Sequence, residues 1–332
     1  MSLIIQMNQQ KALFLLPVTL LIAAITLFGF IGNAFVFYIY RTKFKKSTGN
    51  FFIVALSILD ILSCVIACPF EIFDMSQPYF TGNIVCCKVF RFIELILNCA
   101  AGVMLVPIAI DRHAKVYNPL EYQTIGQARN KIIVTIALSV SCAWPQLALS
   151  GTRIVQTGLE CVVGEDCSIA SEFEGSVYTL LAYFWQYFVF LASLLCIVIT
   201  YAHIVFIIAN RRKTVTGKRK KVVTPQKSVV PDPEFKIHVS AGSKKIRANK
   251  TTVLMIAVTT STILSYVPYL SVEVMKHNSI IFKPGMSAAL DILSEFCFKS
   301  YFLSRVINPI IYFAIDYNFR RECFALVKWS AK

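Results

Sequence analysis

The sequence predicts an all-α membrane protein: a seven-transmembrane helix bundle followed by a short amphipathic eighth helix. Of its 332 residues, 56% are apolar and only 15% are charged, and the mean hydropathy is +0.64. A water-soluble domain carries about 25% charged residues, so this chain has too little polar surface to cover itself in water. The number of long apolar windows then predicts how often the chain crosses a bilayer.

Seven apolar windows are long enough to cross a membrane. A helix that spans about 30 Å of hydrocarbon needs about 20 mostly apolar residues. Four windows contain no Asp, Glu, Lys or Arg, namely residues 12–40, 132–152, 175–210 and 251–272. The other three hold a few charged residues and cover 51–70, 92–110 and 292–314. Seven crossings place the two termini on opposite sides of the membrane.

The distribution of Lys and Arg predicts the orientation of these spans. Of the 33 basic residues, 25 lie in segments 41–46, 112–131 and 211–250 and after residue 314. Since cytoplasmic loops carry the excess of Lys and Arg, we expect a multi-pass plasma-membrane protein with an extracellular N-terminus at 1–11. The seven-helix domain then covers 12–315, with a third cytoplasmic loop at about 211–250, and the amphipathic helix and short tail cover 316–332. The net charge of +15 is explained by this orientation and by anionic membrane lipids, so no nucleic-acid partner is expected.

Two short motifs stand at the inner ends of the third and seventh windows. They are Asp111-Arg112-His113 and Asn308-Pro309-Ile310-Ile311-Tyr312. Further matches occur in order along the chain: Gly32-Asn33, Leu56-Ser57, Asp60, Cys87 placed 25 residues before Arg112, Tyr201, Pro268 and Phe319-Arg320. Together, over residues 28–324, these motifs resemble the rhodopsin-like (class A) G-protein-coupled receptors.

The resemblance implies a receptor that activates a heterotrimeric G protein, with no enzymatic activity and no cofactor. Arg112, paired with Asp111, would be the inner latch that opens to admit a G-protein helix, and Tyr201 would belong to the same switch. Asn308 and Pro309 would kink the last helix, because proline interrupts the helical hydrogen bonds, and Tyr312 would swing at that kink. The family usually has Tyr, Trp and Pro where this chain has His113, Tyr266 and Ser193.

Cysteines and the outer loops add two expectations. The resemblance implies a disulfide between Cys87 and the second outer loop, which holds both Cys161 and Cys167. Cys167 is favoured because its distance from Tyr201 is nearer the spacing usual in the family than that of Cys161, although sequence alone does not decide the connectivity. Cys323, in the amphipathic stretch, is a candidate for palmitoylation, with an unmodified thiol as the alternative. Alternation over 152–163 predicts a short hairpin, of the kind found over peptide-receptor pockets.

Acidic residues near the outer ends of the spans suggest a cationic ligand. Glu94 lies 18 residues before Arg112, where the resemblance to aminergic receptors implies a counter-ion for an amine. The other residues expected around the pocket are Glu71, Tyr266, Tyr269, Glu273, Asp291 and Glu295. We expect a basic or amidated neuropeptide, with a biogenic amine second. The alternative for Glu94 is a pair within the protein, with Arg91 or Lys299. Retinal is not expected, because Lys299 lies nine residues before Asn308 and opsins carry their lysine six residues before that position.

A buried acid–base pair is the last expectation. In the family, the residue matching Asp60 commonly holds a sodium ion, but here Ala101 removes one oxygen ligand and Arg305 stands where the last helix faces Asp60. A guanidinium offers five donors, so we expect Arg305 to satisfy both carboxylate oxygens of Asp60 and no metal to bind. The alternative is that Arg305 turns toward Glu295 or water.

Two other classes of protein remain open. Asp60 and Arg305 within the membrane would suit a transporter or an ion path, but no inverted repeat is visible. The four histidines, at positions 113, 203, 238 and 277, have no metal-ligand spacing, and no nucleophile motif stands near a base. An enzyme is therefore not expected.

Overall fold

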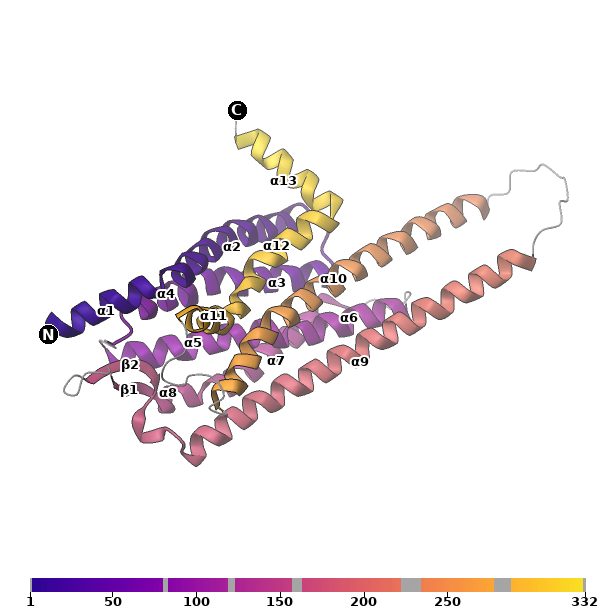
Figure 1. Ribbon diagram of the computed structural model, residues 1–332. Coiled ribbons are helices and arrows are strands. Elements are labelled where there is room, and N and C mark those ends of the chain that lie inside the picture. Colours follow the sequence, from indigo (N-terminus) through magenta and orange to yellow (C-terminus); the bar gives the residue numbers. More distant parts are fainter. Residues whose placement is uncertain are drawn as a thin grey trace.

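The computed structural model describes residues 2–79, 83–118, 123–156, 163–221, 234–277 and 288–330 as an elongated helical bundle (Figure 1). Its α-helices are α1 (Ser2–Phe14), α2 (Leu16–Thr42), α3 (Thr48–Leu62), α4 (Cys68–Ser76), α5 (Ile84–Val103), α6 (Leu105–Tyr117), α7 (Ile125–Ala143), α8 (Pro145–Leu149), α9 (Val177–Lys221), α10 (Glu234–His277), α11 (Ala288–Phe298), α12 (Ser304–Ile315) and α13 (Tyr317–Ser330). A π-helix η1 (Ser63–Ala67), two 3-10 helices, η2 (Ser171–Phe173) and η3 (Ser300–Leu303), and two strands, β1 (Ser150–Gln156) and β2 (Val163–Ile169), complete the described part.

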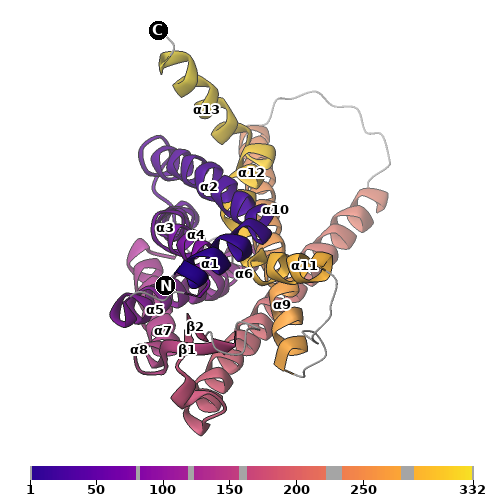
Figure 2. The same ribbon diagram turned by 60° about the vertical axis from the view of Figure 1, so that its left-hand side comes forward.

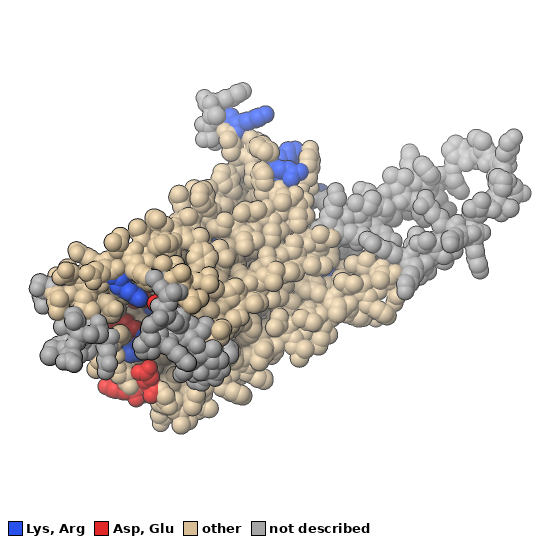
Figure 3. Space-filling view, in the orientation of Figure 1, with Lys and Arg blue, Asp and Glu red and all other residues tan. Residues whose placement is uncertain are grey.

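Six described segments are long and apolar enough to cross a membrane. They are Leu16–Thr42, Thr48–Ser76, Ile84–Tyr117, Ile125–Leu149, Val177–Arg211 and Thr252–Val272, and a shorter apolar segment covers Ser300–Ile315. In the face shown in Figure 3, the charged side chains of the described residues lie near the ends of the bundle, with a broad band free of them between. The predicted fold class is confirmed, with the seventh span contributed by α11, η3 and α12.

That seventh span is not the continuous helix expected over 292–314, which corrects the sequence-based expectation. The chain tightens into the 3-10 helix η3 between α11 and α12. The Ser300 hydroxyl donates to the Ser265 carbonyl oxygen at 2.8 Å, and the Ser304 hydroxyl donates to the Tyr301 carbonyl oxygen at 2.9 Å. Serine hydroxyls that bond to backbone carbonyls compete with regular helix geometry, which accounts for the break.

Prolines explain most of the other irregularities. A proline lacks the amide hydrogen, and its ring clashes with the carbonyl oxygen four residues earlier. Pro69 follows the π-helix η1, Pro107 follows the break at Met104 between α5 and α6, and Pro145 begins α8. Pro268, in contrast, lies inside the long helix α10. The sequence shows where a helix is disturbed, but not whether it bulges, breaks or only bends.

Polar side chains cap the first turns of several helices. The Ser47 hydroxyl accepts a hydrogen bond from the Asn50 amide at 3.2 Å before α3, and Asn83 caps α5 in the same way. Thr124 and Gln127 form a reciprocal capping box before α7. Such caps satisfy the amide groups that a helix leaves without partners at its start.

The N-terminal segment forms a helix of its own rather than a simple polar extension. Helix α1 lies at the same end of the bundle as the two strands, which we call the hairpin end (Figure 1). The Asn8 side chain donates to Gln77 Oε1 at 3.3 Å and accepts from the Tyr79 amide at 2.9 Å. The Tyr79 carbonyl oxygen in turn accepts from the Glu165 amide at 3.3 Å. These contacts connect α1 to β2.

At the opposite end, which we call the α13 end, α9 continues to Lys221 and α10 begins at Glu234. Both helices therefore extend into the region 211–250, and residues 222–233 lie outside the described residues. Helix α13 is the expected eighth helix. Its Phe319 ring stacks on Tyr40 with ring centroids 5.6 Å apart and meets the Tyr312 ring at 6.4 Å.

The core runs along the middle of the bundle. Seen in Figure 2, the helices surround α6, which lies near the centre. Ile22, Phe52, Met104 and Met255 are almost fully buried in one continuous apolar cluster. Gly32 allows α2 to approach α12, because a Cβ atom at this position would lie 2.8 Å from Pro309 Cβ.

Candidate functional site

The two strands form an antiparallel hairpin over the end of the bundle. Arg153 on β1 pairs with Asp166 on β2 in the register of the sheet, and its Nε donates to Asp166 Oδ1 at 3.1 Å. Burial alone would lower the pKa of Arg153, but the hydrogen bond and charge of Asp166 and the nearby Glu174 raise that pKa above its usual value. The predicted hairpin is confirmed, with strands 150–156 and 163–169 instead of 152–163, and its tip lies outside the described residues.

A disulfide fastens this hairpin to the bundle. Cys87 at the start of α5 is bonded to Cys167 on β2, with their Cα atoms 5.7 Å apart. This confirms the expected pair, and Cys161 lies outside the described residues. The Phe70 and Phe90 rings stack beside the bridge with centroids 4.8 Å apart. The hairpin is therefore held close to α4 and α5.

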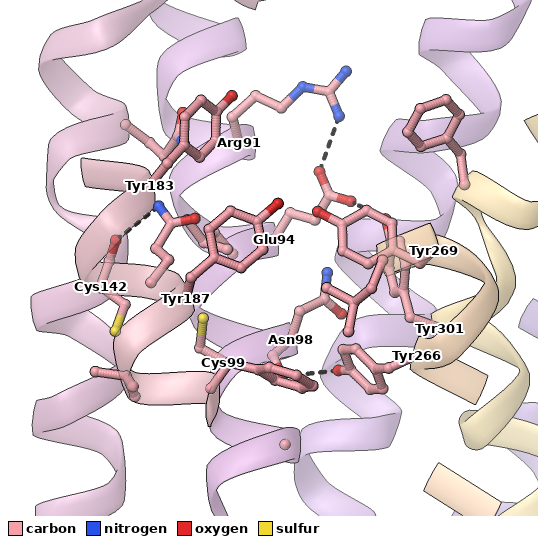
Figure 4. A pocket seen from close by; sticks show the side chains of 18 of the residues that line it. Arg91, Glu94, Asn98, Cys99, Cys142, Tyr183, Tyr187, Tyr266, Tyr269 and Tyr301 are labelled. Carbon is pink, nitrogen blue, oxygen red and sulfur yellow. Dashed lines mark hydrogen bonds and ion pairs between the residues drawn. The ribbon is translucent and has the colours of Figure 1, made fainter. Parts of the chain in front are cut away.

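Beneath the hairpin lies a cavity of about 630 Å³. Its walls come from α5, α7, α9, α10, α11 and η3, and Figure 4 shows how side chains from these elements face one another. Five tyrosines line it: Tyr183, Tyr187, Tyr266, Tyr269 and Tyr301. A cavity of this size with aromatic walls and a few convergent polar groups is typical of a ligand site.

Arg91 on α5 is the centre of a charged cluster at the side of this cavity. Its Nη1 lies 2.6 Å from Glu71 Oε1 and 3.0 Å from Glu94 Oε2, and its Nη2 lies 2.7 Å from Asp74 Oδ2. Nη2 also donates to the Cys167 carbonyl oxygen at 3.1 Å. One guanidinium thus joins α4, α5 and β2.

Lys299 completes the charged cluster from the last span. Its ammonium group pairs with Glu71, whose side chain is fully buried. The Tyr301 hydroxyl donates to Glu94 Oε1 at 2.8 Å. Among the described residues, three carboxylates in this cluster therefore face two cations, Arg91 and Lys299.

This arrangement bears on two of the residues expected around the pocket. Glu71 lines no part of the cavity and is paired on both sides, so it does not reach the pocket as a free carboxylate. Glu94 does line the cavity, but it is paired with Arg91, which is the alternative that the sequence left open. Sequence spacing placed the carboxylates but could not show that Arg91 turns toward all of them.

The other residues expected around the ligand pocket differ in where the structure places them. Tyr266, Tyr269 and Glu295 line the cavity. Asp291, in the first turn of α11, is not among its lining residues. The side chain of Glu273 lies outside the described residues.

Several lining residues were missed by the sequence analysis. They are Arg91, Asn98, Arg153, Tyr183, Tyr187 and Tyr301. A signal existed for two of them, because residues four apart share one face of a helix, and Tyr183 and Tyr187 have that spacing on α9. For the others no spacing pattern distinguishes a lining residue from a packed one.

Deeper in the bundle, Arg305 and Asp60 lie together and are both almost fully buried. Arg305 Nη1 lies 3.2 Å from Asp60 Oδ1. The second carboxylate oxygen accepts from Asn308 Nδ2 at 3.0 Å. The structure thus differs from the expectation that the guanidinium serves both oxygens, because Asn308 lies one helical turn further along α12 and reaches Oδ2 itself.

Three further donors of Arg305 are also occupied. Nε donates to Ser63 Oγ at 3.2 Å, Nη1 to Ser304 Oγ at 3.0 Å and Nη2 to Asn98 Oδ1 at 2.8 Å. The sodium ion that the family resemblance implies does not fit this centre, because Arg305 already supplies a fixed positive charge to one Asp60 oxygen and Asn308 donates to the other.

The Asp-Arg-His motif forms a buried ion-pair site at the α13 end. Arg112 pairs with Asp111, which also accepts from the Thr48 hydroxyl at 2.6 Å and pairs with Lys115 at 2.9 Å. His113 Nε2 lies 2.7 Å from His203 Nδ1 on α9, which joins the two helices where the family usually has a tyrosine.

The other expected switch residues also lie toward the α13 end. The Tyr201 hydroxyl forms a hydrogen bond of 2.9 Å with Thr259 Oγ1, connecting α9 to α10. Tyr312 is buried, and its ring lies 5.8 Å from the Tyr40 ring. Within the part of the chain that the structure describes, the Tyr312 hydroxyl has no hydrogen-bond partner.

Comparison with known proteins shows the class to which this architecture belongs. Residues 32–312 match the family model described as 7 transmembrane receptor (rhodopsin family). The chain therefore belongs to the rhodopsin family of seven-transmembrane receptors. It is a multi-pass membrane receptor of a signalling family and not an enzyme.

Individual relatives are more distant. The chain is 29% identical over 132 residues to the neuropeptide S receptor of Homo sapiens, an alignment that covers 40% of this chain and 36% of that protein. It is 22% identical over 310 residues to neuropeptide Y receptor type 1 of Xenopus laevis, covering 90% and 77% of the two chains. It is 24% identical over 314 residues to neuropeptide Y receptor type 4 of Mus musculus, covering 91% and 76%. The match thus spans about a third of the first relative and about three quarters of the other two.

Proposed function

We propose that this chain is a plasma-membrane receptor that binds a basic or amidated neuropeptide in the cavity under the hairpin and activates a heterotrimeric G protein at the α13 end. Three relatives named as neuropeptide receptors support a peptide ligand. The hairpin supports the same conclusion. It is held to α5 by the Cys87–Cys167 bridge, and a cavity of about 630 Å³ remains beneath it.

The orientation follows from charge. The segments with most Lys and Arg join the spans at the α13 end, which the positive-inside rule assigns to the cytoplasm. The hairpin end, including α1 and the N-terminus, is then extracellular, where an oxidising environment permits the disulfide. The basic and amphipathic helix α13 would lie against membrane lipids.

The charged cluster beside the cavity is the observation that carries the ligand class. Within the described residues, the cations paired with Glu71, Asp74 and Glu94 are Arg91 and Lys299. An uncompensated charge away from water is costly, so a cationic group entering the cavity near Glu94 would balance the cluster. An arginine or lysine side chain, or the amino terminus of a peptide, supplies that charge.

Other observations weigh against the remaining candidates. A biogenic amine would bring the same positive charge to Glu94, but the relatives named as neuropeptide receptors favour a peptide as its carrier. An ion path would need a free charge in the membrane, but Asp60 and Arg305 neutralise each other. These observations favour the peptide receptor over both alternatives.

At the α13 end, the arrangement supports a switch that opens toward a G protein. Arg112 is held by Asp111 and is almost fully buried. Release of Arg112 would expose a cationic surface between α6, α9 and α10. Pro309 within α12 and the unbonded Tyr312 hydroxyl would allow the last helix to rearrange with it.

Cys323 on α13 is proposed as a lipid attachment site. It is half-buried, and burial raises the pKa of its thiol to about 11. A thiol with this pKa is neutral at physiological pH and a weak nucleophile. Acylation at Cys323 would therefore depend on an enzyme, and would hold α13 against the membrane.

The proposed function is tested by screening neuropeptide and amine libraries on membranes that contain the receptor and a promiscuous G protein. We expect peptides with a basic or amidated group to stimulate nucleotide exchange, and amines to have little effect. Membranes without the receptor, and membranes with the Arg112→Ala variant, serve as controls. Exchange driven by amines alone, or solute flux without exchange, would contradict the proposal.

A further inference from the structure

The floor of the cavity continues directly into the buried polar centre of the bundle. Tyr266 and Asn98 both line the cavity, and the Tyr266 hydroxyl donates to the Asn98 carbonyl oxygen at 3.0 Å (Figure 4). On its other side, the Asn98 side-chain oxygen accepts from Arg305 Nη2 at 2.8 Å. Asn98 is thus bound from the cavity and from the core at the same time.

Arg305 extends this connection into the lower half of the bundle. It pairs with Asp60, whose second oxygen accepts from Asn308 Nδ2. The Arg305 carbonyl oxygen also accepts from Asn33 Nδ2 at 2.8 Å. The network therefore joins helices α10, α5, α12, α3 and α2 in one series of short contacts.

Two properties of a guanidinium make this network different from one built on an ion. It is always charged and presents its donors in a fixed planar fork, so each donor requires an acceptor in a defined direction. It is also covalently attached to α12 and cannot leave the site as a bound ion can. Movement of any one acceptor must therefore be followed by movement of Arg305 or by loss of a hydrogen bond.

We propose that Arg305 is a built-in cation that couples the cavity to the inner switch, by which we mean the switch residues toward the α13 end, including Arg112 and Tyr312. We also propose that Asn98 is the residue that positions Arg305. This inference rests on the proposed function, because it takes the cavity as the ligand site. An occupant of the cavity that displaces the Tyr266 hydroxyl releases the Asn98 backbone and alters the contact of Asn98 with Arg305. Arg305 then shifts relative to Asp60, and the segment of α12 that begins with Asn308 and contains Pro309 shifts with it.

The first test measures ligand-free nucleotide exchange by Asn98 and Tyr266 variants. Asn98→Ala removes an acceptor from a charged donor and should raise basal exchange at least about tenfold per folded receptor. Asn98→Asp keeps an acceptor for Arg305 Nη2 and should raise exchange less than Asn98→Ala does. Tyr266→Phe removes a neutral hydrogen bond and should raise exchange about two- to tenfold, whereas Tyr38→Phe, a change at an exposed position on α2, should have no effect.

A purely structural role for Asn98 gives a different result. In that case Asn98→Ala lowers the thermal unfolding midpoint, and neither Asn98→Ala nor Asn98→Asp raises basal exchange per folded receptor. That pattern would overturn the coupling. Absence of exchange by every variant and the wild type, with each class of G protein, would refute the coupling together with the proposed function.

The second test uses sodium alone and needs neither ligand nor G protein. The thermal unfolding midpoint of purified wild-type receptor should be the same in sodium chloride and in N-methylglucamine chloride. Arg305→Ser exposes Asp60 to an incoming ion and should be stabilised by sodium, whereas Asp60→Asn/Arg305→Ser should not. A sodium-dependent midpoint in the wild type would overturn the built-in cation even if Arg305→Ser fails to fold. This arm decides the role of Arg305 separately from the proposed function.

Discussion

Gly49 on α3 leaves just enough room for the guanidinium of Arg112, and this close approach predicts how to open the inner switch. A Cβ atom at Gly49 would lie 2.2 Å from Arg112 Nη2 and 3.1 Å from Arg112 Cζ. Non-bonded heavy atoms prefer separations of about 3.5–4.0 Å. In the Gly49→Ala variant the guanidinium must therefore leave its present position beside Asp111. The guanidinium is the far end of a flexible side chain, so it can move without displacing the helix.

The size of the effect follows from the contacts that are lost and kept. A hydrogen bond to a charged group contributes about 1.5–3 kcal/mol, and each 1.4 kcal/mol changes an equilibrium about tenfold. The open form of the switch should thus become about 10- to 100-fold more populated. Asp111 keeps its contacts with Thr48 at 2.6 Å and Lys115 at 2.9 Å, so its carboxylate is not left unpaired. Alanine also favours the helix by about 0.5–1 kcal/mol relative to glycine.

Ligand-independent nucleotide exchange on added G protein measures this prediction, with rates divided by the amount of folded receptor. Gly126→Ala is the matched control, because a Cβ atom there meets only Thr124 Oγ1 at an ordinary distance of 3.7 Å. We expect raised basal exchange for Gly49→Ala and wild-type exchange for the control. A Gly49→Ala receptor that folds normally and shows wild-type basal exchange would refute the role of the Arg112–Asp111 contact.

Three further predictions concern the cavity, the hairpin and α13. Glu94→Gln should weaken binding of an arginine-containing peptide by about 1.5–3 kcal/mol in a competition assay. The affinity of the variant for the citrulline analogue of that peptide should be unchanged. Equal losses of affinity for both peptides would indicate a structural role for Glu94. Cys87→Ser should abolish peptide binding at the cell surface, because the hairpin loses its attachment, whereas Cys86→Ser, at a free and exposed cysteine, should retain it; full binding by Cys87→Ser would be the contrary result. With its pKa raised to about 11, Cys323 should react slowly with iodoacetamide at neutral pH and faster as the pH approaches that value, and rapid alkylation at pH 7 would contradict its burial.

The sequence predicted the buried pair better than it predicted the cavity. The resemblance to the receptor family placed Arg305 and Asp60 together, because the position of Arg305, three residues before Asn308, usually faces the residue matching Asp60 in that family. It could not assign the hydrogen bonds, because these depend on side-chain rotamers: Asn308 takes one Asp60 oxygen, and Asn98 takes a donor of Arg305. The helical period shows which face a residue occupies, but not which of several neighbours it will reach.

The charged cluster shows a second limit. Sequence reasoning expected the outer carboxylates around the pocket and left open a pair of Glu94 with Arg91 or Lys299, but it did not predict that both cations converge on Glu71 from two different spans. Lys299 reaches it from the junction between α11 and η3, where the regular helical period has ended. Contacts made across such irregular segments carry no periodic signal.

Concentration–response curves for nucleotide exchange test the central claim most directly, with purified receptor in lipid bilayers, a heterotrimeric G protein and pairs of amidated peptides that differ only in arginine or citrulline. Citrulline keeps the shape of arginine and removes its charge. The charged cluster beside Glu94 predicts exchange driven by the arginine peptide, with about 10- to 100-fold lower potency for the citrulline peptide. Equal potency of the two peptides, or an ion current across the bilayer with no exchange, would contradict the account.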